Sequence, residues 1–166
     1  MDYRIEKMGP MTVVCKRKLV NKPQGDTATA DISAFWRECT EAGVFEKLCR
    51  YGSPERMGGI LGICFSGEMA NSAFPYAIGA EHNGEPLAAD CGLGLVTVPE
   101  NIYAVFECRG RMPDAFRETY KRICSEFFPQ SNYEYGNGVE LEVYPSTDVS
   151  DPNYYCQIWI AVKPKR

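Results

Sequence analysis

The sequence predicts an α+β fold in which a strand-helix-strand-strand unit occurs twice and builds one antiparallel sheet, with two main helices on one face and a ligand groove on the other. Strand-like and helix-like segments follow each other in the same order in both halves of the chain. The halves also share local sequence, because DISAFWRE resembles MPDAFRE and ILGICFS resembles LEVYPS. We therefore expect a single domain over residues 1–166, with pseudo-two-fold halves of about 1–82 and 83–166.

The first half supplies a strand, a helix and two strands. Residues 11–20 are rich in β-branched side chains, which is typical of a strand. A helix is expected to open at Asp31, whose carboxylate can cap free backbone amides, and to stop near Gly43. The runs ILGICFS and FPYAIGAE then predict two antiparallel neighbours.

The second half repeats this order. NIYAVFEC predicts a strand, and Gly110 ends it. Pro113 is suited to the first turn of a helix, which is expected to end before Pro129. VELEVYPS and YYCQIWIAV predict the last two strands.

Composition excludes several classes of function. With 18 Lys and Arg against 22 Asp and Glu, the net charge of −4 argues against direct binding of nucleic acid. No apolar run is long enough for a membrane span, and no export signal is present, so we expect a cytoplasmic protein. The eight cysteines contain no C-x-x-C pair and His82 is the sole histidine, so neither a metal site nor a cofactor is expected.

Strand alternation predicts which side chains line the groove. In VELEVYPS, Leu141 and Val143 point one way, and we expect them under the helices. Glu140, Glu142 and Tyr144 would then face the open side. By the same reasoning, the last strand turns its isoleucines to the core and presents these residues on the open side: Tyr155, Gln157 and Trp159.

A glycine stands opposite the acidic position in the repeat. Aligning the halves places Gly62 where the second half has Glu142, and a glycine within a strand often marks a close approach by another group. Tyr76 and Tyr103 are further candidates for the wall. A carboxylate among aromatic rings suits an apolar cation. For each aromatic residue, packing in the core is the alternative, and Glu142 is alternatively an ordinary surface residue.

These strands resemble the GyrI-like effector-binding family, which includes the ligand-binding domains of AraC- and MerR-type transcriptional regulators. The resemblance extends from Tyr3 to Val162 and depends on the strand order, the Y-A-V-F strand and the E-V-Y strand. It implies a groove that binds hydrophobic, frequently cationic compounds, with Glu142 and Tyr144 at the family's glutamate and tyrosine. One departure is the segment 127–129, Phe-Phe-Pro, where many members carry a tryptophan.

Three functions follow from the resemblance. The first is a stand-alone protein that binds a hydrophobic or cationic small molecule and acts alone or through a regulator partner, with Trp36 and Trp159 reporting binding. No helix-turn-helix pattern precedes the first strand. The second is a hydrolase of cyclopropanoid or other electrophilic genotoxins, with Glu142 as general base and Tyr144 beside it. The third is inhibition of DNA gyrase as a partner protein.

Overall fold

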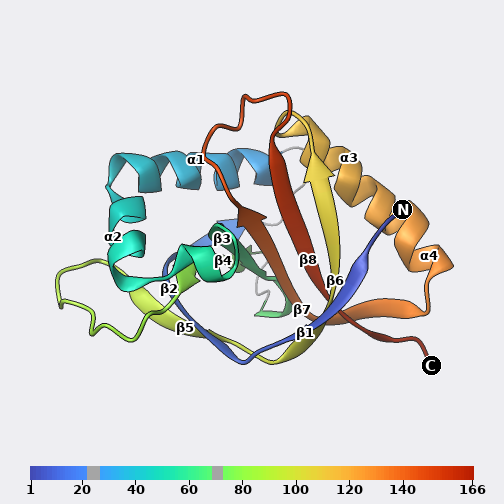
Figure 1. Cartoon of the computed structure of the whole chain (residues 1–166), viewed down its shortest axis with the longest axis horizontal. Helices are drawn as coiled ribbons and strands as arrows, with labels where there is room; N and C mark the ends of the chain where they lie inside the picture. The colour runs from blue at the N-terminus through green and yellow to red at the C-terminus, as the bar shows by residue number, and fades with distance from the viewer. Residues whose placement is uncertain (22–26, 69–72) are drawn as a thin grey trace.

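The computed structural model describes residues 1–21, 27–68 and 73–166 and shows one curved antiparallel sheet with helices packed on its outer side (Figure 1). The predicted α+β class and antiparallel sheet are confirmed. The strands are β1 (Arg4–Met8), β2 (Met11–Asn21), β3 (Ile60–Phe65), β4 (Ala73–Glu81), β5 (Gly94–Val98), β6 (Asn101–Arg109), β7 (Tyr133–Tyr144) and β8 (Tyr155–Pro164).

Helices follow β2 in the first half and β6 in the second. The helices of the first half are α1 (Thr27–Glu41) and α2 (Val44–Tyr51). In the second half, α3 (Asp114–Arg122) continues through a π-helical turn (Ile123–Phe127) into α4 (Phe128–Gln130). None of the helices in the described part of the chain is both long and apolar enough to cross a membrane.

Two predicted helix ends differ from the structure. The first helix begins at Thr27 rather than at Asp31, so Asp31 lies inside α1 and is not its cap. The helix of the second half runs on to Gln130, because the π-helical turn precedes Pro129 and the N–H of Ser131 donates to the backbone oxygen of Phe127 at 2.8 Å, which closes a further turn. Gly43 does interrupt the first helix: its left-handed backbone (φ 68°) separates α1 from α2.

The sheet order is symmetric. From edge to edge it runs β1-β6-β8-β7-β3-β4-β2-β5, with β7 and β3 paired at the centre. Strands β1 and β2 lie at or near opposite ends of this order although only Gly9 and Pro10 separate them in the chain. Strands β5 and β6 are likewise joined by Pro99 and Glu100 alone. The sheet must therefore curl until its two edges approach each other.

Packing at Gly9 confirms that the edges meet. A Cβ atom on Gly9 would lie 2.6 Å from the Cα atom of Glu100, so the two short connections are in close contact. The backbone of Gly9 (φ +122°) also favours glycine. The sheet is thus a roll with an inner and an outer face.

Both faces of the roll are apolar. The inner face is filled by residues from all the central strands, including Leu61, Ile63, Tyr103, Leu141 and Trp159. On the outer face, one cluster lies under α1 and α2 and another under α3. The prediction that one face of the sheet is open is therefore wrong, because the curvature of the sheet closes that side. The two helical layers flank the central pair β3 and β7, as Figure 1 shows.

Candidate ligand-binding site

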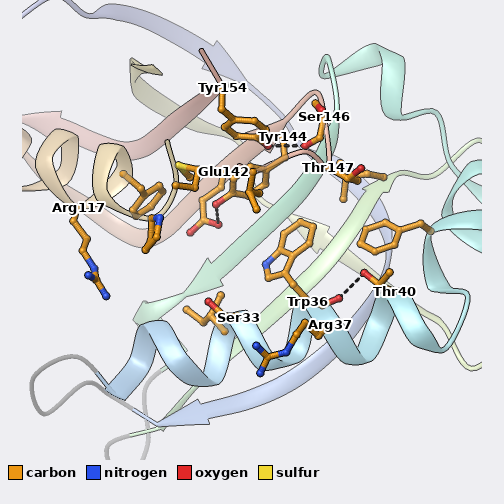
Figure 2. A pocket seen from close by; sticks show the side chains of 17 residues that line it. Ser33, Trp36, Arg37, Thr40, Arg117, Glu142, Tyr144, Ser146, Thr147 and Tyr154 are labelled. Atoms are coloured by element: carbon orange, nitrogen blue, oxygen red, sulfur yellow. Dashed lines mark hydrogen bonds between the residues drawn. The ribbon is translucent and has the colours of Figure 1, made fainter. Parts of the chain in front are cut away.

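A cavity of about 550 Å³ opens between the two helical layers, over the centre of the sheet. The predicted groove is therefore on the helical side of the sheet and not on the opposite side. Figure 2 shows its walls, which come from α1, α2, α3, β7 and the loop after β7. The lining is formed by Ile32, Ser33, Trp36, Arg37, Thr40, Phe45, Ile60, Met112, Pro113, Phe116, Arg117, Glu142, Tyr144, Ser146, Thr147, Val149 and Tyr154.

Glu142 of β7 lies at the floor of this cavity, directly opposite Gly62 of β3. A Cβ atom on Gly62 would lie 2.6 Å from Glu142 Oε2, and closer still to the hydroxyl of Tyr76. The close approach expected at Gly62 is thus present. Any larger residue there would displace the carboxylate or the phenol beside it.

Three side chains hold the Glu142 carboxylate in place. Tyr144 donates a hydrogen bond to Oε2 at 2.7 Å, and Tyr76 donates to the same oxygen at 2.9 Å. The indole Nε1 of Trp36, on α1, donates in turn to the Tyr76 hydroxyl at 3.0 Å. Among the described residues, Oε1 of Glu142 has no hydrogen-bond partner, so this oxygen is available to a ligand.

Burial shapes the protonation of this cluster. Glu142 is half-buried at the cavity floor, and loss of solvent raises the pKa of its carboxyl; the hydrogen bonds from Tyr144 and Tyr76 offset part of that rise. Burial, followed by the nearby Glu142 charge, raises the pKa of both tyrosines well above the ordinary value. The tyrosines therefore remain hydrogen-bond donors at neutral pH.

Aromatic rings form the rest of the inner wall. Trp36 packs edge-on against Tyr144, with ring centroids 5.1 Å apart, and stacks on Phe45 at 5.9 Å. Phe116 of α3 lines the opposite side. Tyr154 donates a hydrogen bond from its hydroxyl to the backbone oxygen of Ser146 at 2.6 Å, which ties the ends of the loop between β7 and β8 together.

Five of the predicted site residues thus come together: Glu142, Tyr144, Tyr76, Gly62 and Trp36. Four others lie on the inner face of the roll: Tyr103, Tyr155, Gln157 and Trp159. The register explains the difference, because Glu142 pairs with Ile158 and shares its face, whereas Trp159 pairs with Leu141. The expectation that β7 and β8 present their Glu, Tyr and Trp side chains on one surface is therefore wrong.

The four inner residues make their own contacts. Trp159 Nε1 donates to Gln157 Oε1 at 2.9 Å, and Gln157 Nε2 donates to the Tyr155 hydroxyl at 2.8 Å. Tyr103 is fully buried and packs edge-on against Trp159, with centroids 5.8 Å apart. These contacts indicate packing of the roll, which was the alternative considered for the aromatic residues.

Several lining residues were not predicted from the sequence. On α1, Ser33, Arg37 and Thr40 follow the helical spacing of Trp36 and share its face. On α3, Phe116 and Arg117 follow Pro113 at helical spacing and share its face. The shared motif of the two helices was a signal that could have found them. The described residues contain no group of three or more His, Cys, Asp or Glu side chains placed to bind a metal ion.

This chain is similar to known proteins in both sequence and fold. The family model described as integron-associated effector binding protein matches residues 4–162. The chain belongs to this family. The match spans nearly the same residues as the resemblance to GyrI-like effector-binding proteins, which is confirmed.

Solved structures share the fold of this effector-binding family member. SAV2435, solved bound to tetraphenylphosphonium, has a TM-score of 0.80 and 23% identity, with 98% of this chain and 94% of that chain covered. A candidate transcription regulation protein from Staphylococcus aureus has a TM-score of 0.79 and 24% identity, covering 98% and 99%. The C-terminal domain of EcmrR has a TM-score of 0.62 and 10% identity, covering 99% of each chain. Among curated proteins, none matches the sequence.

Proposed function

We propose that this protein binds hydrophobic cations in the cavity between α1 and α3, and that Glu142 recognises their charge. One observation carries the proposal: a half-buried carboxylate lies at the floor of a largely apolar cavity, and one of its oxygens has no hydrogen-bond partner in the part of the chain that the structure describes. An ionised carboxylate withdrawn from water is costly unless an opposite charge approaches it. A cationic ligand would supply that charge.

The aromatic wall supports the same class of ligand. A cation over an aromatic ring gains about 0.5–2 kcal/mol, depending on how far it is desolvated. Trp36, Tyr144, Phe45 and Phe116 provide such rings around the floor. SAV2435, which shares the fold, was solved with a phosphonium cation whose substituents are aromatic. Membership of an effector-binding family further supports a role as a ligand sensor that acts with a regulator partner.

Binding of tetraphenylphosphonium tests the proposal. We expect isothermal titration calorimetry to detect binding to the wild type and Glu142→Gln to weaken it by about tenfold or more, since one charge pair in a desolvated site contributes at least about 1.4 kcal/mol. Glutamine keeps the shape and can still accept from both tyrosines. Glu118→Gln, which removes an exposed charge from α3, serves as control. Equal affinity in wild type and Glu142→Gln would contradict the assigned role.

Hydrolysis of an electrophilic ring is a second candidate, and the free Oε1 of Glu142 favours it. In this reaction water adds to the ring carbon while Glu142 takes one of its protons, and the carbon–carbon bond of the ring breaks. The carbon that keeps the electron pair of that bond then receives the proton from Glu142. The signature in mass spectrometry is a product heavier by one water. Gyrase inhibition has no support from a particular residue.

A further inference from the structure

Two arginines lie on opposite walls of the cavity. Arg37 extends from α1 and Arg117 from α3, and Figure 2 shows both among the lining side chains. Both side chains are exposed, unlike Glu142, which lies on the sheet below them. The cavity therefore has a carboxylate at its floor and guanidinium groups where it opens to solvent.

The two arginines occupy equivalent places in the repeated motif. Arg37 belongs to DISAFWRE and Arg117 to MPDAFRE, and in each helix the arginine directly follows an aromatic residue that lines the cavity, Trp36 or Phe116. One helical turn thus places an aromatic ring and a guanidinium side by side on each wall. The cavity is lined by matching pairs from the two halves.

Arg37 has no competing partner among the residues that the structure describes. Across residues 1–21, 27–68 and 73–166, no hydrogen bond or ion pair engages its guanidinium group. By contrast, other exposed arginines are paired, such as Arg50 with Glu85 at 3.5 Å and Arg56 with Glu81 at 3.2 Å. Arg117 differs from Arg37 because it is paired within the protein, and Asp114 at 4.0 Å is one of its contacts.

These positive charges are unfavourable for a ligand that is only a cation. They become favourable if the ligand also bears an anionic group, because guanidinium binds carboxylate and phosphate groups through paired N–H donors. We infer that the preferred ligands of this cavity are zwitterions, whose aromatic cationic body reaches Glu142 while an anionic group is bound by Arg37 at the opening. This inference rests on the proposed function, since it assumes that the cationic body binds at Glu142.

The polar residues at the opening fit this arrangement. Ser33 and Thr40 are exposed on the same face of α1 as Arg37 and line the cavity. The Ser33 hydroxyl is a further donor to an anion, whereas the Thr40 hydroxyl already donates to the backbone oxygen of Trp36 at 2.9 Å. A cavity of about 550 Å³ lies within the range of sites that hold drug-sized molecules, so one ligand can reach from floor to opening.

Rhodamine B and its ethyl ester provide matched probes. They share one aromatic cationic body, but rhodamine B also carries a carboxylate and is a zwitterion at neutral pH. Fluorescence anisotropy would give the ratio of the ester's Kd to the Kd of rhodamine B. We expect this ratio to fall about fivefold in Arg37→Gln, as for loss of one charged hydrogen bond near the surface, and to fall less in Arg117→Gln, because Arg117 is already paired within the protein.

Controls separate this inference from a general charge effect and from the proposed function. Arg50→Gln removes an equal charge outside the cavity and should leave the ratio unchanged, whereas Arg37→Glu should lower it further than Arg37→Gln. A ratio that is the same in wild type, Arg37→Gln and Arg117→Gln would overturn the inference, as would an equal fall in Arg50→Gln. If the ester binds and depends on Glu142 while the ratio ignores Arg37, only this inference fails. If neither rhodamine probe nor tetraphenylphosphonium binds, both the proposed function and this inference fail.

Discussion

Glu142 could be predicted as the central residue because alternation along a single strand is reliable. Glu142 and Tyr144 are two residues apart on β7 and therefore share a face. Gly62 was predictable from the repeat. The hydrogen bond from Trp36 to Tyr76 was not, because it joins residues 40 apart in sequence on α1 and β4, and only the packed structure brings them together.

Stability of the fold should depend on the charge of Glu142. Burial raises the pKa of this carboxyl in the folded state above its unfolded value, so the ionised form destabilises the fold. This cost is absent below the unfolded pKa of about 4.3, grows through the folded pKa and is complete above it. We therefore expect Glu142→Gln to be more stable than the wild type at pH 8 and similar at pH 4.

Urea denaturation at a series of pH values measures this difference. Tyr76 and Tyr144 remain protonated throughout. The Glu142 charge also contributes to the raised pKa of Glu140 on the same face of β7, so the difference between the two proteins reports the Glu142 charge together with its effect on Glu140. A glutamine variant that is less stable than the wild type at pH 8 would show that the ionised carboxylate stabilises the fold, contrary to this account.

At the scale of elements, the long periodic segments were predicted and the short ones were not. The predicted strands correspond to β2, β3, β4, β6, β7 and β8. The elements that were missed are α2 and the five-residue strands β1 and β5. Each of these strands is held by a partner from the other half of the chain, β6 for β1 and β2 for β5, and such pairing leaves little signal in a short sequence window.

The pairing of β3 with β7 predicts a sensitive glycine. In Gly62→Ala, the new methyl group would meet the Tyr76 hydroxyl and Glu142 Oε2, so we expect a loss of about 1–3 kcal/mol of stability and weaker binding of tetraphenylphosphonium. Gly94→Ala in β5 is the matched control, because nothing lies within 4 Å of a Cβ atom there. Equal stability of the two variants, measured by thermal unfolding, would argue against tight packing at the cavity floor.

At the scale of the whole molecule, the curvature of the sheet was the feature that the sequence did not reveal. The inside of the roll is as apolar as the surface under the helices, so alternation shows which residues share a face but not which face lies under the helices. Closure of the roll depends on contacts such as Gly9 with Glu100, which are 91 residues apart. The symmetric sheet order agrees with a duplication at about residue 82, which stays a prediction.

We expect the cavity between the helical layers, and not the inner face of the roll, to bind the ligand. The most direct test is a crystal structure of the complex with tetraphenylphosphonium. We expect the phosphonium centre in the cavity, nearest to Oε1 of Glu142, with its phenyl rings against Trp36, Tyr144 and Phe116. A phosphonium bound beside Trp159 and Gln157 on the inner face, or elsewhere on the surface with the cavity empty, would contradict it.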